Sequence, residues 1–207
     1  MRSPRNRPIF PLFQTPIDLA HDYWQRLLHP GDYVIDATCG NGHDTLFLAN
    51  LVLKKDTNGQ LLAMDTQAEA IQNTQQLLQD NLAKNMLDRV SFFNGCHSTF
   101  PSQIEKESIT LIVYNLGYLP GGNKELTTTS STTLQSLQAA LPLIVPGGAI
   151  SITCYPGHPA GKVEETEILS FTNSLSPLEW SCCYHRWINR NQAPSLILIQ
   201  RGGREGA

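Results

Sequence analysis

The sequence predicts an α/β fold in which a doubly wound, mostly parallel sheet ends in an antiparallel hairpin. Apolar strand segments alternate with helical segments, and each strand–helix unit takes roughly thirty residues, as parallel crossover connections require. The strand segments are largely apolar throughout, which is typical of a sheet covered on both faces. Two final strand segments, 180–187 and 195–200, are separated by asparagine and proline residues, which indicates a terminal β-hairpin.

The first elements follow from the proline and cap positions. Residues 1–14 carry prolines and arginines and are expected to form an N-terminal arm, so that 15–207 make up a single domain. Thr15 followed by Pro16 predicts a helix start, with the threonine as N-cap and the proline at the first helical position. We expect this helix to continue to about Leu28, before the Pro-Gly pair that follows it.

The remaining elements alternate between strand and helix. The predicted strands span 33–37, 60–64, 89–93, 110–114 and 148–153. The predicted helices span 42–53, 67–84, 97–105, 130–144 and 162–174. In an open sheet of this kind ligands bind at the carboxyl ends of the strands. We therefore look for functional residues in the loops that follow the predicted strands.

Composition limits the class of protein. The chain has 207 residues, of which 41% are hydrophobic and 16% charged, as in an ordinary globular domain. A net charge of −3 argues against a broad surface that coats nucleic acid, although a local basic patch is compatible with it. Arginines near both ends could contact RNA or simply keep the ends soluble. The five cysteines include no C-x-x-C pair, which predicts reduced thiols and no metal site. The sequence shows no signal peptide and no long apolar run, which predicts a cytoplasmic protein without a membrane span.

The most informative segment is the loop after the first predicted strand, residues 36–44. Gly40 and Gly42 lie between that strand and a helix start, where backbone can approach a ligand and helix N–H groups point at it. The spacing lacks the third glycine of a dinucleotide-binding motif, which disfavours a nicotinamide-dependent oxidoreductase. The D-x-x-x-G-x-G pattern resembles motif I of the S-adenosylmethionine (SAM) methyltransferases. We therefore expect this loop, with Thr38 and Asn41, to bind SAM.

Three acidic residues accompany the loop. Asp36 ends the first strand and is expected to organise the loop or to receive the ammonium group of SAM. Asp44 is expected to share that role, or to be a first-turn acid that the helix dipole favours. Asp65 ends the second strand, where a carboxylate can accept hydrogen bonds from both ribose hydroxyls of a bound nucleoside. It also precedes a helix that it could cap, and together with the glycine loop we favour the ribose role.

Three later loops carry further candidates. Cys96 and His97 follow the third strand and are predicted to flank adenine, unless the segment is an ordinary helix cap. Asn115 and Tyr118 follow the fourth strand and resemble the D/N-P-P-Y-type motif of amino-methylating enzymes, which holds the target amine. Asn115 is expected to face SAM as well, and a packed turn without chemistry is the alternative. His158 follows the fifth strand as a candidate base or substrate ligand, although a loop histidine usually has no catalytic role.

Together these segments resemble the rRNA methylase family, which includes tRNA methyltransferases of the YtqB/MnmM type. The resemblance runs from about residue 15 to 200, and its matching motifs are 36–49, 115–122, 146–148 and 157–161. It implies a class I SAM-dependent methyltransferase fold. It also implies a tRNA substrate, with methylation of the 5-aminomethyl group of the wobble (thio)uridine, and often a homodimer.

Two segments depart from the family pattern, and two other functions compete with the one it implies. Residues 157–161 read G-H-P-A-G in place of the family's G-H-P-G-G, and 189–195 match its N-x-x-N-x-P-P motif only loosely. One rival is methyl transfer to rRNA or to a small-molecule amine, which the acidic isoelectric point favours modestly. The other is a SAM-binding module without catalysis, which an intact Asn115–Tyr118 turn disfavours.

Overall fold

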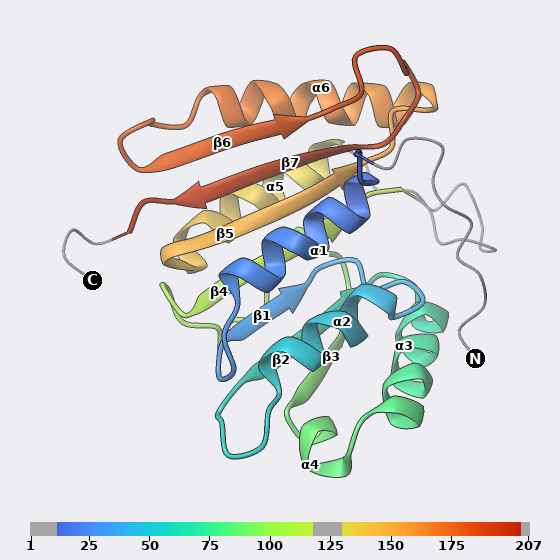
Figure 1. Ribbon diagram of the computed structural model, residues 1–207, viewed down its shortest axis with the longest axis vertical. Coiled ribbons are helices and arrows are strands. Elements are labelled where there is room, and N and C mark those ends of the chain that lie inside the picture. The colour runs from blue at the N-terminus through green and yellow to red at the C-terminus, as the bar shows by residue number, and fades with distance from the viewer. Residues whose placement is uncertain (1–11, 118–129, 204–207) are drawn as a thin grey trace.

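The computed structural model describes residues 12–117 and 130–203, and these residues form one seven-stranded sheet (Figure 1). The strand order is β3-β2-β1-β4-β5-β7-β6. The chain starts at a central strand, builds outward to β3, returns to β4 and β5, and ends in a hairpin at the far edge. The doubly wound α/β architecture that the sequence predicts is confirmed.

The strands run in two directions. Five are parallel to one another, namely β1 (Tyr33–Asp36), β2 (Gln60–Asp65), β3 (Val90–Asn94), β4 (Ile109–Asn115) and β5 (Ile144–Cys154). The hairpin consists of β6 (Trp180–His185) and β7 (Ser195–Arg201), and β7 is antiparallel to both β5 and β6. As a result, β6 ends at the same edge of the sheet as the five parallel strands.

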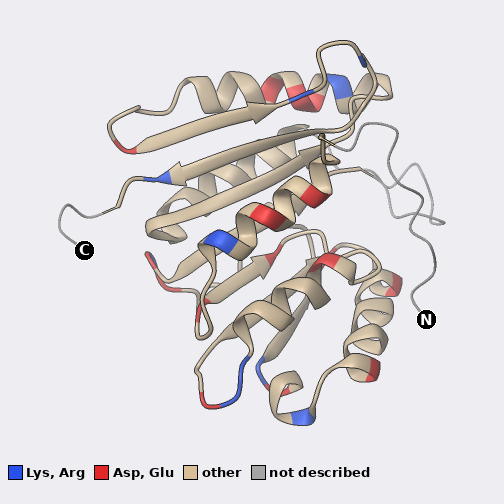
Figure 2. Ribbon diagram, in the orientation of Figure 1, with Lys and Arg blue, Asp and Glu red and all other residues tan. Residues whose placement is uncertain are grey.

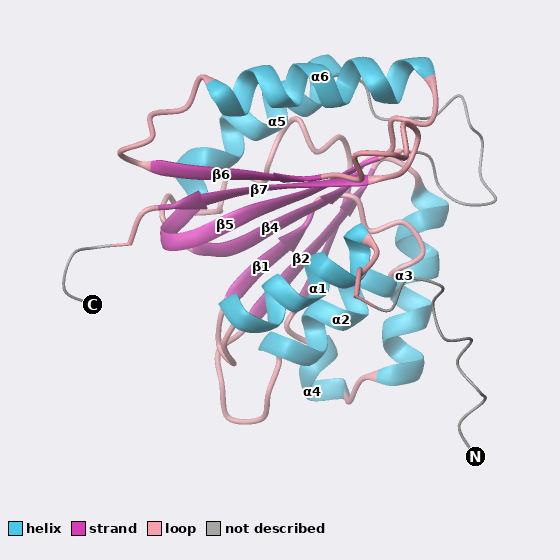
Figure 3. Ribbon diagram, turned by 45° about the horizontal axis from the view of Figure 1, so that its top comes forward, coloured by secondary structure: helices cyan, strands magenta, loops and turns pink. Residues whose placement is uncertain are grey.

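Helices cover both faces of the sheet, as Figure 3 shows. One face carries α1 (Pro16–Leu27), α2 (His43–Val52), α3 (Ala68–Asn81) and the single turn α4 (Lys84–Leu87). The other carries α5 (Ser130–Ala140), the 3-10 turn η1 (Leu141–Leu143) and α6 (Pro159–Asn173). None of the described helices has the length and apolarity that crossing a membrane requires.

The core explains why the strands are apolar at successive positions. Val34 and Ile35 are adjacent in β1, and both are fully buried. Val34 belongs to the buried cluster that includes Trp24 of α1, whereas Ile35 packs in the cluster of Leu137 and Ile168 from α5 and α6. Because both faces are covered, the sheet is a densely packed frame that sets where the carboxyl ends of its strands lie.

Several predicted bounds differ from the structure, and two of these differences have a clear physical reason. The predicted helix over 97–105 is wrong, because this segment consists of turns. Pro101 has no backbone N–H to donate, and the carbonyl of His97 accepts a hydrogen bond from Ser136 Oγ at 2.6 Å instead of serving a helix. The helix predicted over 130–144 ends at Ala140, because Pro142 lies in the following 3-10 turn and β5 has already begun at residue 144.

Candidate functional site

The glycine loop connects β1 to α2 at the carboxyl edge of the sheet. Gly40 and Gly42 have φ angles of +52° and +83°, in the left-handed region that favours glycine. A Cβ on Gly42 would lie 2.9 Å from the Cα of Thr74 in α3, so a side chain cannot be added there without moving backbone. Gly42 is also the N-cap of α2, and no side chain caps this helix. The first-turn N–H groups of α2 therefore form an anion-binding helix N-terminus next to the loop.

Asp65 holds the loop from the end of β2. Its Oδ2 accepts a hydrogen bond from the Gly40 N–H at 3.0 Å, and its Oδ1 accepts one from the Gln67 N–H at 3.0 Å. The Gly40 carbonyl in turn accepts from Thr74 Oγ1 at 3.1 Å. Asp65 thus holds the glycine loop and also stabilises the turn that leads into α3, so the place before a helix that the sequence indicated is compatible with a role in the loop. Each carboxylate oxygen can accept a second hydrogen bond, so this half-buried group can still bind a ligand hydroxyl.

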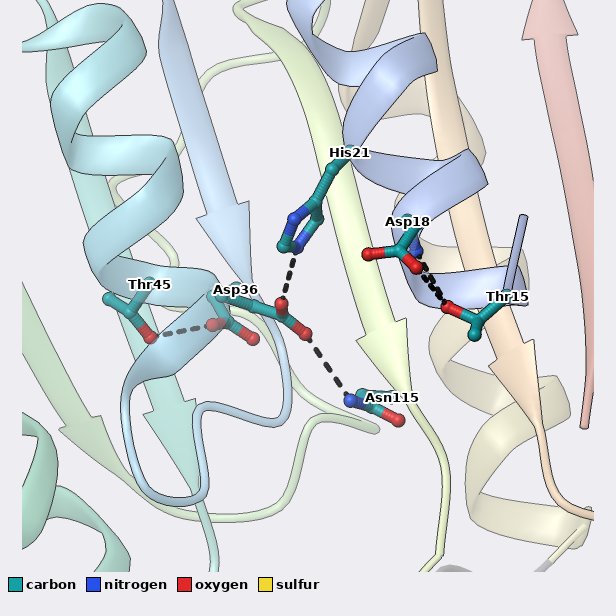
Figure 4. A network of polar contacts seen from close by, with 7 residues as sticks. Thr15, Asp18, His21, Asp36, Thr45 and Asn115 are labelled. Atoms are coloured by element: carbon teal, nitrogen blue, oxygen red, sulfur yellow. Dashed lines mark hydrogen bonds and ion pairs between the residues drawn. The ribbon is translucent and has the colours of Figure 1, made fainter. Parts of the chain in front are cut away.

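Asp36 organises the loop from below. Its side chain is 1% exposed, and its Oδ2 accepts from Thr45 Oγ1 at 2.6 Å (Figure 4). Its Oδ1 accepts from the Thr38 N–H at 3.2 Å. Burial, and after it the negative charge of Asp44, raises the pKa of Asp36 to about 7. Because the side chain is buried and both of its oxygens accept hydrogen bonds inside the chain, the geometry favours the organising role over direct contact with a ligand ammonium.

Thr38 and Asn41 join the loop to its neighbours. Thr38 Oγ1 accepts a hydrogen bond from the Asn115 N–H at 2.7 Å, which ties the loop to the end of β4. Asn41 Oδ1 accepts from Asn73 Nδ2 of α3 at 3.2 Å. These contacts fix the positions of two predicted cofactor residues relative to the strand that carries Asn115.

A network of three side chains lies between α1, α2 and β4 (Figure 4). Asp44 Oδ1 is 2.7 Å from His21 Nε2, and Asp44 Oδ2 accepts a hydrogen bond from Asn115 Nδ2 at 3.2 Å. The ring of His21 stacks on Phe47, with 3.9 Å between centroids and an interplanar angle of 14°. The network turns the Asn115 amide nitrogen towards Asp44. The amide oxygen therefore lies on the opposite side, where it can accept a hydrogen bond from a ligand.

Sequence reasoning missed two residues of this site. Tyr155 directly follows β5. Burial raises the pKa of its hydroxyl, and the negative charge of Asp44 raises it further, whereas a hydrogen bond with the Asn115 side chain lowers it. Its place directly after a strand was an available signal. His21 carries no sequence signal, because only the packing of α1 beside α2 brings it to Asp44.

The loop after β3 places its two candidates differently. His97 is 5% exposed, its ring meets Tyr114 edge to face at 5.7 Å, and its Nδ1 has no hydrogen-bond partner. Burial lowers the pKa of His97 to about 4, which favours a neutral ring. This core position argues against the predicted place of His97 beside adenine. Cys96 is half-buried, and its Sγ accepts from Ser98 Oγ at 3.1 Å, in a segment that has no helix to cap.

His158 has a structural role. It is the N-cap of α6, where its Nδ1 accepts a hydrogen bond from the Gly161 N–H at 3.1 Å. That bond requires a bare Nδ1, so the neutral ring carries its proton on Nε2. Taking up a further proton would break the cap, which argues against the predicted role as a base. Tyr118, the other predicted partner of Asn115, lies outside the described residues.

Comparison with known proteins adds sequence relatives to this geometry. A model of the family described as "Putative rRNA methylase" matches residues 61–201. The chain is also 40% identical over 185 residues to the chloroplastic tRNA (mnm(5)s(2)U34)-methyltransferase of Arabidopsis thaliana. That match covers 88% of this chain and 68% of the plant protein.

Two solved structures share the fold over nearly their whole length. A "putative rRNA-methylase" from Clostridium thermocellum is 35% identical with a TM-score of 0.84, covering 91% of this chain and 98% of that one. A "putative methyltransferase" from Streptococcus mutans in complex with SAH is 28% identical with a TM-score of 0.78, covering 91% and 99%. The class I methyltransferase fold that the sequence predicts is thereby confirmed. This chain belongs to the rRNA methylase family.

Proposed function

We propose that the chain is a SAM-dependent methyltransferase that N-methylates the 5-aminomethyl group of the wobble (thio)uridine of tRNA. The observation that carries the chemistry is Asn115, which ends β4 beside the glycine loop with its amide oriented by Asp44. The substrate class is supported by the plant relative, which is named as a tRNA (mnm(5)s(2)U34)-methyltransferase and is 40% identical.

The residues at the carboxyl edge fit SAM. The uncapped N-terminus of α2 suits the carboxylate of its amino-acid end, and Asp44 in the first turn of that helix suits its ammonium group. Asp65, at the end of β2, suits the two ribose hydroxyls, which need acceptors. When bound, SAM supplies a methyl group on a positively charged sulfur, which is a good leaving group.

Asn115 would orient the acceptor. Its Oδ1 accepts a hydrogen bond from the target amine, so that the nitrogen lone pair faces the methyl carbon. Asp44 holds the amide in this orientation through the 3.2 Å bond to Nδ2, and His21 holds Asp44 from the other side. The amine reacts in its neutral form, because only that form has a free lone pair. Since an amide is not a base at neutral pH, Asn115 does not take the proton of the methylated product, which leaves to water.

Three further properties belong to the same proposal. All five cysteines are free thiols, which suits the reducing cytoplasm that we propose as the location. A homodimer is proposed from the family resemblance. The division into an arm over 1–14 and one domain over 15–207 is supported by the start of α1 at Pro16, with Thr15 as its N-cap.

Methyl transfer to defined acceptors tests the function. Labelled SAM is offered with tRNA from a strain that lacks the gene, and in parallel with rRNA and with small-molecule amines. We expect label only in tRNA, in a nucleoside that mass spectrometry identifies as 5-methylaminomethyl(-2-thio)uridine. Label in rRNA or in the small amines, with none in tRNA, would contradict the proposed substrate.

Substitution of Asn115 tests the mechanism. We expect Asn115→Ala to bind SAM as the wild type does but to lose about 100-fold or more in turnover, because the amine is no longer oriented. Asn81→Ala, at the end of α3 outside the site, is the matched control and should keep wild-type turnover. Wild-type turnover in Asn115→Ala would remove this residue from the reaction.

A further inference from the structure

A groove lies between the segment that leads into α1 and the loop that joins β6 to β7. Its volume is about 560 Å³. Phe13 and Leu19 line one wall, and Arg186, Trp187 and Arg190 line the other. We call it the arm–hairpin groove. Figure 1 shows the start of α1 and the β6–β7 loop at the same end of the molecule, where β6 and the parallel strands end.

The groove exposes apolar side chains in one place. Leu12 is 88% exposed, Ile188 is 87% exposed and Phe13 is 61% exposed, and all three line it. The rings of Phe13 and Trp187 meet edge to face with 5.4 Å between centroids, so the two walls touch through aromatic side chains. Single exposed apolar residues are ordinary, whereas a contiguous group on a soluble domain marks a binding surface.

The charges of the groove are positive. Arg190 lies over the ring of Trp187, with its Cζ 4.2 Å from the centroid, and Arg186 is exposed at the start of the loop. No described residue that lines the groove is acidic, although the whole chain has a net charge of −3. Figure 2 shows basic segments at the end of β6 and in the loop after it. Aromatic faces beside guanidinium groups suit the bases and phosphates of single-stranded RNA.

The groove is connected to the candidate site through α1. Leu19 lines the groove, and His21, two residues later, contacts Asp44 of the site. Two residues correspond to a rise of about 3 Å along a helix and to nearly opposite sides of it, so α1 lies between the groove and the site. The hydroxyl of Tyr23 lies 3.2 Å from His185 Nε2, which ties the same helix to the end of β6. Strand spacing places β6 roughly 14 Å from β4, a span that neighbouring nucleotides of one RNA strand can bridge.

We propose that the arm–hairpin groove binds the unpaired nucleotides that flank the target base. This inference rests on the proposed function, because it takes the methylated amine to be part of an RNA strand. Trp187, which contacts both Phe13 and Arg190, stacks on a base, and the two arginines contact the adjacent phosphates. The groove thereby supplies RNA affinity to a small acidic domain.

Binding of a labelled RNA hairpin that carries 5-aminomethyluridine in its single-stranded loop tests the groove. Fluorescence anisotropy is measured at several fixed salt concentrations, because phosphate contacts are salt-dependent. We expect Trp187→Ala to weaken binding about tenfold or more, and Trp187→Phe to restore most of the affinity. Arg190→Ala should weaken binding and flatten its salt dependence. Leu178→Ala and Arg26→Ala, which lie at the opposite edge of the sheet, should bind as the wild type does.

Separate measurements distinguish this inference from the proposed function. All variants should keep wild-type SAM affinity and thermal unfolding, which shows that the fold is intact. If Trp187→Ala and Arg190→Ala bind the hairpin as tightly as the wild type, the groove inference is overturned and the proposed function stands. If the wild type binds the hairpin but does not methylate its 5-aminomethyl group, the proposed function fails instead. Groove variants that dissociate a dimer without changing RNA affinity would assign the groove to self-association and overturn the inference.

Discussion

Asp65 provides the sharpest test of the cofactor geometry. The structure gives its carboxylate two backbone partners, the N–H groups of Gly40 and Gln67, each at 3.0 Å, and ribose binding adds hydroxyl donors. A hydrogen bond to a charged group contributes about 1.5–3 kcal/mol. Removing the carboxylate in Asp65→Ala should therefore raise the Kd for SAM tenfold to about 100-fold. Isothermal titration calorimetry measures this directly, and unchanged affinity would refute the assignment.

Two comparisons separate ribose contact from loop loosening. Glu69→Gln removes the same charge from an exposed position in the first turn of α3 and should leave SAM affinity unchanged. An S-adenosylhomocysteine analogue without ribose hydroxyls should bind the wild type more weakly than the parent compound. In Asp65→Ala the two compounds should bind about equally, because the coupling between carboxylate and hydroxyls is gone. An equal loss on removing the hydroxyls in both proteins would mean that Asp65 acts only by holding Gly40.

Two further predictions concern stability, measured without SAM. Urea unfolding should show that Gly42→Ala destabilises the fold by about 2–4 kcal/mol, because its φ is +83° and the new Cβ would contact the Thr74 Cα. Gly147 has a similar φ of +85°, but a Cβ there meets no atom within 4 Å, so Gly147→Ala should lose only about 1–2 kcal/mol. Equal losses would show that the contact is relieved at no cost. The folded-state pKa of Asp36, about 7, lies above the ordinary aspartate pKa of 3.8, so its contribution to stability should fall as pH rises from about 4 to about 7. The wild type should therefore lose stability relative to Asp36→Asn as pH rises over that range. A difference in unfolding free energy that does not change with pH would contradict the buried-carboxylate argument.

The order of strands and helices could be predicted because each strand is buried on both faces. Val34 and Ile35 are apolar neighbours in β1, and such runs, separated by helical segments, predict a parallel sheet. The segment over 97–105 misled the prediction, because its local pattern allows a helix. Its tertiary contacts, such as the bond from Ser136 to the carbonyl of His97, favour a turn-rich loop.

The roles of the candidate residues could be predicted only in part. Gly40, Gly42 and Asp65 carry sequence signals, since left-handed glycines and an acid after a strand are local features, and the structure brings them together. His97 and His158 have the same residue type and similar loop positions, yet one ring is buried in the core and the other caps a helix. Burial and hydrogen-bond partners depend on the packing of distant segments, which the local sequence does not specify.

By itself, the sequence determined the fold class, the glycine loop and the presence of an asparagine at the end of the fourth strand. Only the tertiary structure decided that His21 and Asp44 orient Asn115, and that Phe13 meets Trp187 across a groove at the same edge. Periodicity and turn residues act over a few positions of the chain, so they are visible in the sequence. The His21–Asp44–Asn115 contacts and the Phe13–Trp187 contact join residues that are far apart in the chain. The packing of α1 between the glycine loop and the hairpin brings these residues together.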